Sequence, residues 1–310
     1  MKHLISIAEL SAEDLRRILG LARQLKDEWA RSASAAGNRP ILKGKVMGMI
    51  FQKPSLRTRI SFDVAMLQLG GHALYISPSE ISLGERESVP DVARVLSRYV
   101  DVIMARVFAH KHVQQLAEYS RVPVINGLSD YSHPCQGITD MFTIWEKVGD
   151  LDGLRLTYLG DANNVAASLL FAATKLGMDF VIGHPAGFGL PPDVLALGQQ
   201  FARRSGSRVV VTNDPLEAVT DARVVYTDTW TSMGQEAERA TREAVFPPYQ
   251  VNAGLLSRAR PDAIVMHCLP AHRGQEITDD VADGGQSVLF DQAENRLHAQ
   301  KGILAFLMLD

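Results

Sequence analysis

Short apolar runs alternate with amphipathic segments along the whole chain, and this alternation limits the possible folds more than any other feature. A buried parallel strand is a short continuous apolar run, whereas a helix spaces its apolar residues three or four apart. The runs predict strands at residues 46–51, 73–77, 100–106, 122–126, 154–159, 180–183, 208–212, 222–227 and 263–267. Helical spacing lies between them, for example over residues 91–99. The pattern predicts an α/β protein with two doubly wound parallel-sheet domains joined by helices.

The strongest break near mid-chain is the Gly-Asp-Leu-Asp-Gly segment at residues 149–153. At about 150 residues per domain, a chain of 310 residues accommodates two domains. We therefore expect a first domain over residues 1–149 and a second over residues 150–290. A last helix is expected from about residue 292 to residue 309.

Composition excludes several classes of protein. Lys and Arg number 32 against 35 Asp and Glu, so the net charge is −3, which disfavours a general nucleic-acid binder. The two cysteines, Cys135 and Cys268, are too few for a disulfide scaffold or a cysteine-rich metal centre. No stretch approaches the roughly 20 apolar residues of a membrane span, and the N-terminus has no signal-peptide pattern. We expect a cytoplasmic protein that binds neither nucleic acid nor membranes.

Basic and hydroxyl side chains follow strand ends in the first half. Strand 46–51 leads into Pro-Ser-Leu-Arg-Thr-Arg at residues 54–59, where a helix begins. A helix N-terminus with guanidinium and hydroxyl groups suits an oxyanion, although a capped helix with exposed arginines fits equally well. Arg106 ends another strand, and His133 and Gln136 begin another helix. Such groups at neighbouring strand ends could polarise a carbonyl and bind an amide.

Polar turns also follow the strands of the second half. The turn at residues 160–164 lacks the complete glycine pattern of a dinucleotide site, which argues against a nicotinamide cofactor. Residues 227–234 contain Asp228, hydroxyl groups and a glycine, and could form either a ligand loop or an ordinary polar loop. Cys268 follows the last strand in a His-Cys-Leu-Pro sequence and could equally be a small core residue.

Taken in order, these motifs resemble those of the aspartate/ornithine carbamoyltransferase family, over essentially the whole chain. The segments that carry the resemblance are residues 55–59, 133–136, 228–234, 267–270 and 294–296. The resemblance implies a first domain for carbamoyl phosphate, a second for an amino acid, and a C-terminal helix (291–310) that packs back on the first domain. It also implies a homotrimer or an assembly of trimers, and neither metal nor organic cofactor.

The resemblance assigns roles residue by residue. The catalytic residues are Cys268, Arg106 and His133. The residues expected to bind carbamoyl phosphate are Ser55, Leu56, Arg57, Thr58, Arg106, His133, Gln136, Cys268, Leu269 and Arg296. The residues expected to bind ornithine are Asn164, Asp228, Ser232 and Met233.

Two departures from the family pattern need an interpretation. Leu56 stands where the family usually has Thr, and we expect its side chain to point into the core. Ser82 is shorter than the Gln or His of many relatives in a loop, residues 82–88, that the resemblance places over the neighbouring subunit's site. Whether Ser82 or Arg86 contributes there stays open. The resemblance further implies a cis peptide between Leu269 and Pro270, which the small trans preference of X–Pro bonds permits.

The resemblance implies transfer of a carbamoyl group from carbamoyl phosphate to the side-chain amine of L-ornithine, which gives citrulline and phosphate. A lysine-like amine has a pKa of about 10.4, so only about one molecule in 10³ is neutral near pH 7. Either Cys268 or Asp228 could accept the proton. Aspartate as acceptor is disfavoured because Ser-Met-Gly at residues 232–234 replaces a basic loop. An inactive binding paralogue is disfavoured because the reactive side chains are retained. The sequence leaves open whether the enzyme builds or degrades arginine.

Overall fold

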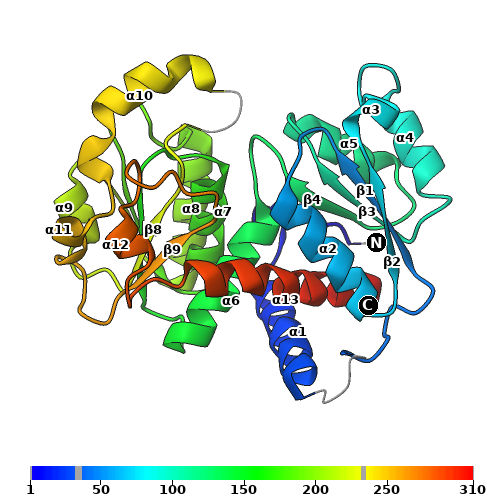
Figure 1. Ribbon diagram of the computed structural model, residues 1–310, viewed down its shortest axis with the longest axis horizontal. Coiled ribbons are helices and arrows are strands. Elements are labelled where there is room, and N and C mark those ends of the chain that lie inside the picture. The colour runs from blue at the N-terminus through cyan, green and yellow to red at the C-terminus, as the bar shows by residue number, and fades with distance from the viewer. Residues whose placement is uncertain (1, 32–36, 232–234, 310) are drawn as a thin grey trace. The chain divides into compact units, whose positions relative to one another are not determined.

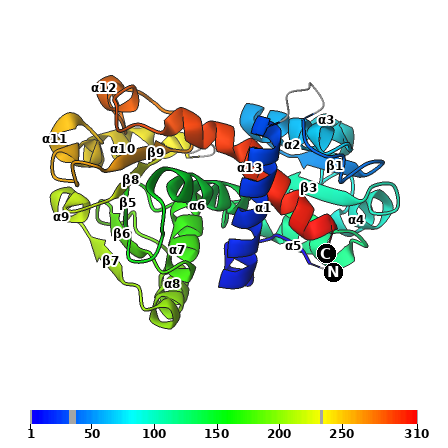
Figure 2. The same ribbon diagram turned by 90° about the horizontal axis from the view of Figure 1, so that it is seen from below.

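The computed structural model describes residues 2–31, 37–231 and 235–309. The chain divides into two compact units (Figures 1 and 2). Unit 1 comprises Met1–Phe142 together with Glu294–Asp310, and unit 2 comprises Thr143–Ala293. Among the described residues, no helix is long and apolar enough to cross a membrane.

Unit 1 contains a four-stranded parallel sheet in the order β2-β1-β3-β4 (Figure 1). Its strands are β1 (Val46–Phe51), β2 (His72–Ile76), β3 (Val102–Arg106) and β4 (Val124–Leu128). Its helices are α1 (Ala12–Arg31), α2 (Leu56–Gln68), α3 (Pro78–Ile81), α4 (Val89–Leu96) and α5 (His110–Tyr119), with a 3-10 turn at Ile7–Glu9. Two further helices run across the boundary between the units, α6 (Pro134–Val148) and α13 (Leu289–Met308).

The core of unit 1 follows from the alternation of side chains along its strands. Ile50 of β1 and Ile103 of β3 pack in one buried cluster with apolar residues of α4 and α5. Gly48 lies on this same face of β1, and an added Cβ there would lie 3.2 Å from the side chain of Leu96. The absence of a side chain at Gly48 therefore lets α4 approach the sheet closely.

Unit 2 contains a five-stranded parallel sheet in the order β7-β6-β5-β8-β9. Its strands are β5 (Arg155–Leu159), β6 (Asp179–Gly183), β7 (Val209–Thr212), β8 (Val224–Thr227) and β9 (Ile264–His267). Its helices are α7 (Asn164–Lys175), α8 (Pro192–Ser205), α9 (Pro215–Val219), α10 (Arg239–Val245), α11 (Ala253–Leu256) and α12 (Asp279–Ala282), with 3-10 turns at Glu236–Glu238 and Pro247–Tyr249.

Helices cover the unit 2 sheet as expected for parallel strands, which must be buried on both faces. Val225 of β8 and Val265 of β9 pack in a buried cluster with residues of α9, α11 and α12. Helices α7 and α8 lie side by side (Figure 2), and the residues of α7 from Val165 to Thr174 are all buried. Such burial explains why α7 is apolar around most of its circumference.

The predicted fold class is confirmed: both sheets are parallel and helices connect their strands. Residues 294–310 of the C-terminal segment belong to unit 1, as the resemblance implied. The ends of several elements differ from the expectation. The helix expected at residues 91–99 is α4 (Val89–Leu96), because the Ser88 side chain accepts a hydrogen bond from the Asp91 N–H and Pro90 occupies the first turn.

In each sheet the strand order reverses at one place, and ligands of open α/β sheets bind there, beyond the carboxyl ends of the strands. In unit 1 the chain runs from β1 outward to β2 and returns to the other side of β1 as β3. In unit 2 it runs from β5 outward through β6 and β7 and returns to the other side of β5 as β8. The candidate sites are therefore expected between β1 and β3, and between β5 and β8.

Candidate active site

Each unit contains one candidate substrate site, which is called a half-site below. The first half-site, in unit 1, begins where β1 passes into α2. Ser55 caps this helix: its hydroxyl accepts a hydrogen bond from the Thr58 N–H at 3.3 Å and donates to the Thr58 hydroxyl at 3.1 Å. Thr58 is buried and Arg57 is half-buried. The 13-residue α2 thus presents a capped N-terminus, with its positive dipole end, at the predicted phosphate position.

The expectation that Leu56 points into the core is wrong. Its side chain is 73% exposed, while Thr58, two residues later in the same turn, is 1% exposed. Helical residues two apart point in different directions, so only one of them can face the sheet. Here that residue is Thr58, and Leu56 lies on the outer surface of α2.

Arg296 of α13 connects two helix segments of unit 1 that are far from it in sequence, one in α2 and one in α6. Its guanidinium, 3% exposed, donates to the Thr58 hydroxyl of α2 at 2.8 Å and to the side-chain oxygen of Gln136 in α6. The amide of Gln136 in turn donates to Asp140 at 2.8 Å. The chain brings Thr58, Gln136 and Arg296 together, as the predicted carbamoyl phosphate site requires.

Arg106 and His133 complete this group. Arg106 is the last residue of β3, 6% exposed, and stands in register with Phe51, the last residue of β1. Burial, followed by the nearby charges of Arg296, Arg106 and Lys53, holds the pKa of His133 well below its usual range. His133 is therefore a neutral imidazole near pH 7, able to donate one hydrogen bond without adding a charge.

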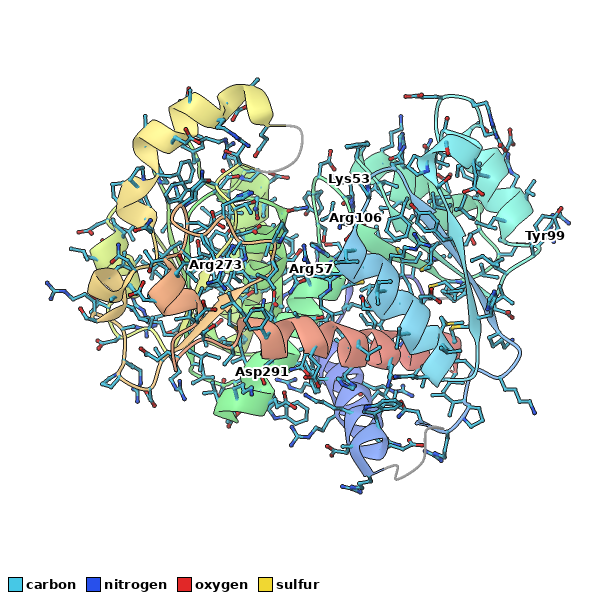
Figure 3. All side chains as sticks on the ribbon, in the orientation of Figure 1. Lys53, Arg57, Tyr99, Arg106, Arg273 and Asp291 are labelled. Carbon is cyan, nitrogen blue, oxygen red and sulfur yellow. The ribbon has the colours of Figure 1, made fainter. Side chains whose placement is uncertain are left out.

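Lys53 also belongs to this group, and the sequence analysis missed it. Burial and the neighbouring Arg106 lower the pKa of Lys53 to about 8, while Asp130 opposes the shift. Its ammonium lies 4.8 Å from the centre of the Phe108 ring, and Figure 3 shows it close to Arg106. The sequence signal that could have identified Lys53 is its position directly before the Pro-Ser pair of the predicted phosphate motif.

The second candidate half-site is centred on Asp228, which follows β8. The Cys268 sulfur lies 3.0 Å from one carboxylate oxygen of Asp228, and the Asn163 amide donates to the other at 2.8 Å. Asn163 also caps α7, accepting hydrogen bonds from the N–H groups of Val165 and Ala166. The Asp228 side chain is thus fixed between the ends of β5, β8 and β9.

Asn163 was not among the predicted ligands, although the turn containing it was singled out. The predicted neighbour, Asn164, is half-buried as the first residue of α7. The signal for Asn163 was its position as a helix cap, where an Asn side chain is favoured. Two predicted ornithine ligands, Ser232 and Met233, lie outside the described residues.

His267 holds the segment that contains Cys268. Its Nδ1 accepts a hydrogen bond from the Leu269 N–H at 2.9 Å, so its proton is on Nε2, which lies 3.0 Å from a carboxylate oxygen of Glu276. Both His267 and Glu276 are fully buried. The peptide between Leu269 and Pro270 is cis, as predicted.

Asp228, His267 and Cys268 are close enough to be tested as a metal site, since their ligand atoms lie within 4.8 Å of one another. Both ring nitrogens of His267 already take part in hydrogen bonds. A metal at this position would have to displace one of them. The arrangement fits an acid–base cluster around Asp228 and Cys268 better than a metal centre.

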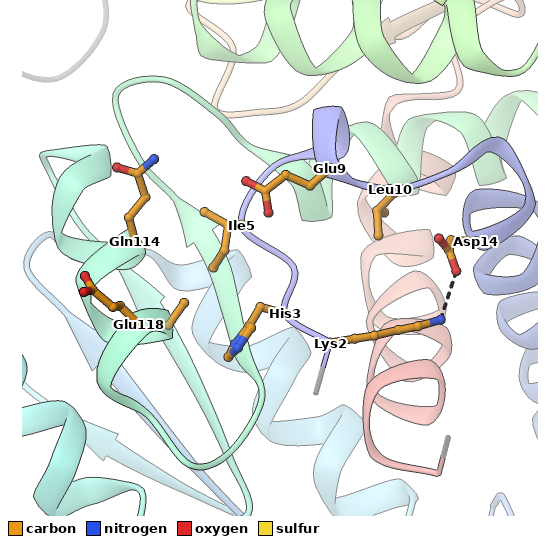
Figure 4. Close-up of a pocket in the computed structure, with 9 residues that line it drawn as sticks. Lys2, His3, Ile5, Glu9, Leu10, Asp14, Gln114 and Glu118 are labelled. Carbon is orange, nitrogen blue, oxygen red and sulfur yellow. Dashed lines mark hydrogen bonds and ion pairs between the residues drawn. The ribbon is translucent and has the colours of Figure 1, made fainter.

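A cavity of about 560 Å³ lies elsewhere in unit 1 (Figure 4). It is lined by the N-terminal segment, including His3 and Glu9, and by Gln114 and Glu118 of α5. None of the predicted site residues lines it. We therefore do not assign the reaction to this cavity.

Comparison with known proteins agrees with this division into half-sites. Residues 2–146 match the family model "Aspartate/ornithine carbamoyltransferase, carbamoyl-P binding domain". Residues 152–307 match the model "Aspartate/ornithine carbamoyltransferase, Asp/Orn binding domain". The chain belongs to the aspartate/ornithine carbamoyltransferase family.

Individual relatives are similar over nearly their whole length. The anabolic ornithine carbamoyltransferase of Pyrococcus furiosus is 52% identical over 307 residues, which cover 99% of this chain and 96% of that protein. A solved ornithine carbamoyltransferase structure from Pyrococcus furiosus has a TM-score of 0.95, and 99% of this chain and 97% of that chain are covered. The anabolic enzyme from Campylobacter jejuni is 36% identical, with a TM-score of 0.93 and 99% of each chain covered.

Proposed function

We propose that this protein is an ornithine carbamoyltransferase, which transfers the carbamoyl group of carbamoyl phosphate to the side-chain amine of L-ornithine. The products are L-citrulline and phosphate. The observation that carries the proposal is the fixed carboxylate of Asp228 at the end of β8, held by Asn163 and Cys268. A fixed carboxylate suits an ammonium group, whereas a second substrate carboxylate, as in aspartate, would be repelled.

Carbamoyl phosphate is assigned to unit 1. The phosphate would accept hydrogen bonds from Ser55, Arg57 and Thr58 at the N-terminus of α2, where helix dipole and guanidinium charge both favour an anion. Arg106 and neutral His133 would donate to the carbamoyl oxygen. Gln136 would bind the carbamoyl NH₂ group, together with the backbone at Cys268 and Leu269.

Ornithine is assigned to unit 2. Its α-amino group would pair with Asp228, and Asn164, Ser232 and Met233 would hold the rest of the amino-acid end. Ser232 and the backbone at Met233 supply donors for the α-carboxylate. Putrescine lacks that carboxylate, and leaving those donors unpaired would cost more than the lost contact alone.

The transfer needs ornithine with an uncharged side-chain amine. Its lone pair attacks the carbamoyl carbon, and negative charge builds on the carbamoyl oxygen opposite Arg106 and His133. The carbon–oxygen bond to phosphate then breaks, and phosphate leaves with that electron pair. The proton lost by the amine passes to a group near Cys268 and Asp228 or to the departing phosphate.

A colorimetric citrulline assay tests the proposal. The purified protein is given carbamoyl phosphate with ornithine, aspartate, putrescine or Nα-acetylornithine as acceptor. We expect the highest kcat/KM with ornithine. A higher value with any other acceptor would reject the named substrate while leaving carbamoyl transfer possible.

A homotrimer or an assembly of trimers is part of the same proposal, with residues 82–88 of one subunit lying over the neighbouring subunit's site. The support is an apolar outer surface on α2, where Leu56, Ile60 and Leu67 are 73%, 50% and 70% exposed. Apolar surface of this kind is typical of a subunit interface. Light scattering should give the mass of three subunits or a multiple of three. A monomer that keeps full activity at assay dilution would contradict the proposed trimer.

We further propose that the enzyme acts in arginine biosynthesis, where it forms citrulline. The support is that the Pyrococcus furiosus relative is named an anabolic ornithine carbamoyltransferase. A cytoplasmic location completes the proposal and is tested by cell fractionation. Growth of an arginine-requiring host strain that lacks this activity would test the direction.

A further inference from the structure

Asp140 is a buried carboxylate of unit 1 that the proposed mechanism does not use. It lies on α6, one turn after Gln136, and is 0% exposed. The side-chain nitrogen of Gln136 donates to one Asp140 oxygen at 2.8 Å. Residues four apart on a helix lie on the same face, so the spacing brings the two side chains together. Burial of a carboxylate is costly unless hydrogen bonds compensate it, and one of these bonds comes from a predicted substrate ligand.

The partners of Gln136 determine the direction of its amide. A carboxylate only accepts hydrogen bonds and a guanidinium only donates them. The NH₂ group of Gln136 must therefore face Asp140, and its oxygen must face Arg296, which donates to it. This assignment follows from the chemistry of the two partners and not from the shape of the amide, whose two ends are nearly alike. Gln136 is thus held in one of its two possible orientations.

The same order of donors and acceptors continues to the helix that carries the predicted phosphate motif. The other terminal nitrogen of Arg296 donates to the Thr58 hydroxyl at 2.8 Å, and the Ser55 hydroxyl donates to the same oxygen at 3.1 Å. A hydroxyl has two acceptor lone pairs and one hydrogen. Because both lone pairs of Thr58 are used, its hydroxyl can meet a ligand only as a donor, which is what a phosphate oxygen requires.

This chain of hydrogen bonds presents opposite polarities at two points. Gln136 presents an oxygen that keeps one lone pair besides the contact with Arg296, which suits an NH₂ group. Thr58 presents a donor, which suits an anion. Carbamoyl phosphate has both features, whereas acetyl phosphate has a methyl group in place of NH₂. A methyl group would leave the Gln136 oxygen without its second partner, which costs more than the lost contact alone.

We propose that Asp140 is a positioning residue that sets the preference for a carbamoyl over an acetyl group, because it holds the Gln136 amide with its oxygen available to the substrate NH₂. This inference rests on the proposed function, which assigns that NH₂ group to Gln136. Asp140 itself has no contact with the substrate. The affinity for inorganic phosphate should not depend on Asp140, because Arg296 can only donate to Thr58 whatever the orientation of Gln136.

The experiment compares Asp140→Leu, which removes the acceptor, with Asp140→Asn, which keeps a side-chain oxygen at the same place. Thr139→Val is the matched control, because Thr139 is the fully buried neighbour on α6 and its hydroxyl donates to the Cys135 carbonyl at 2.7 Å. This variant removes a buried hydroxyl of the same helix and leaves Asp140 and Gln136 in place. Gln136→Leu and Gln136→Leu/Asp140→Leu complete a double-mutant cycle.

Isothermal titration gives Kd for carbamoyl phosphate, acetyl phosphate and inorganic phosphate, and thermal unfolding measures stability in parallel. Wild type should bind carbamoyl phosphate about 10- to 100-fold more tightly than acetyl phosphate, the factor expected for one buried acceptor left unpaired. In Asp140→Leu this ratio should fall to about threefold or less, because the Gln136 oxygen is no longer held in place. Kd for inorganic phosphate should stay within about twofold of wild type.

The other variants separate positioning from stability. Asp140→Asn should keep most of the preference, because its oxygen can still accept from the Gln136 NH₂ group. Thr139→Val should lose stability and keep the full ratio of the two Kd values. In the Gln136→Leu background, Asp140→Leu should not change the ratio further, because the group through which Asp140 acts is absent.

An unchanged ratio in folded Asp140→Leu would overturn the inference. An equal loss of affinity for all three ligands would also overturn it, since that is the result of a purely structural role. Asp140→Ser has no oxygen within reach of the Gln136 amide, so it carries the same prediction if Asp140→Leu does not fold.

The proposed function is tested separately by citrulline formation. Wild type that forms no citrulline but shows the expected ratios would reject the proposed transfer and retain the role of Asp140. Wild type that binds carbamoyl and acetyl phosphate equally well would overturn the role of Asp140, even if it forms citrulline.

Discussion

The two candidate half-sites occupy the same topological position in their sheets and carry opposite charge. In unit 1 the ends of β1 and β3 gather Lys53, Arg57 and Arg106 (Figure 3). In unit 2 the ends of β5 and β8 are followed by Asp161 and Asp228. Strand order thus decides where a ligand binds, and the residues after the strands decide whether it is an anion or an amine.

The half-sites also differ in how their charges are stabilised. In unit 2, hydrogen bonds from Asn163 and Cys268 satisfy both oxygens of Asp228. In unit 1, burial first and then the neighbouring cations lower the pKa values of Lys53 and His133. An anionic ligand would therefore relieve repulsion among the cations of unit 1.

The largest expected effect tests the cationic half-site. Arg106→Ala should lower kcat about 10²- to 10³-fold, the usual cost of one lost donor to developing oxyanion charge. Steady-state kinetics at saturating carbamoyl phosphate measure it. Arg59→Ala is the matched control, because Arg59 is exposed on α2 and stacks on Tyr75, 4.0 Å from the ring centre. Near-normal turnover of folded Arg106→Ala would remove Arg106 from the reaction.

The acidic half-site is tested by Asp228→Asn. We expect KM for ornithine to rise about 10- to 100-fold, because a charge-assisted hydrogen bond to the α-amine becomes a neutral one. Kd for carbamoyl phosphate, measured by calorimetry, should change little. Asp193→Asn, at the exposed start of α8, serves as the control. If Asp228→Asn weakened the binding of both substrates equally, the assignment of ornithine to unit 2 and carbamoyl phosphate to unit 1 would be wrong.

Lys53 gives a smaller, pH-dependent effect. Its pKa is about 8 in the unliganded protein, so its positive charge is lost as the pH rises through 8. Carbamoyl phosphate should bind several-fold more weakly at pH 9 than at pH 7, because the dianion favours the charged amine.

Isothermal titration at the two pH values measures this change. Lys53→Met should show weaker binding at pH 7 and a flatter pH dependence. Exposed Lys111→Met, on α5, is the control. If the affinity for carbamoyl phosphate depended on pH in Lys53→Met as it does in wild type, a group other than Lys53 would be responsible.

The smallest effect concerns stability. Because the folded pKa of His133 lies below its unfolded value of about 6.5, the unfolded chain binds the proton more strongly. His133 therefore lowers the free energy of unfolding as the pH falls below about 6.5, by at most about 1.4 kcal/mol per pH unit. Urea unfolding at pH 7 and pH 5.5 should show a shallower loss for His133→Gln than for wild type or the exposed His72→Gln. An equal loss in all three would mean that His133 is not buried as a neutral group.

Much of the fold follows from local sequence. Apolar runs predict strands because both faces of a parallel sheet are covered, and the observed β1, β5 and β9 agree closely with the expected ranges. Helix starts with a clear cap, such as Ser55, were also predictable. The start of α4 was misplaced because Ser88 and Pro90 were not recognised as its first turn. The direction of Leu56 was wrong because one substituted residue does not reveal which side of a helix faces the sheet.

The sequence by itself determined the fold class and the order of the motifs, since these depend on short-range patterns and resemblance, and it predicts which side chains take part in the reaction. Only the tertiary structure decided that Arg296 of α13 binds Thr58 and Gln136, and that Asn163 holds Asp228. It also decided the lowered pKa of Lys53 and the burial of Asp140. Hydrogen bonding and desolvation depend on which groups lie within a few ångströms, and residues 238 positions apart acquire that proximity only when the chain folds.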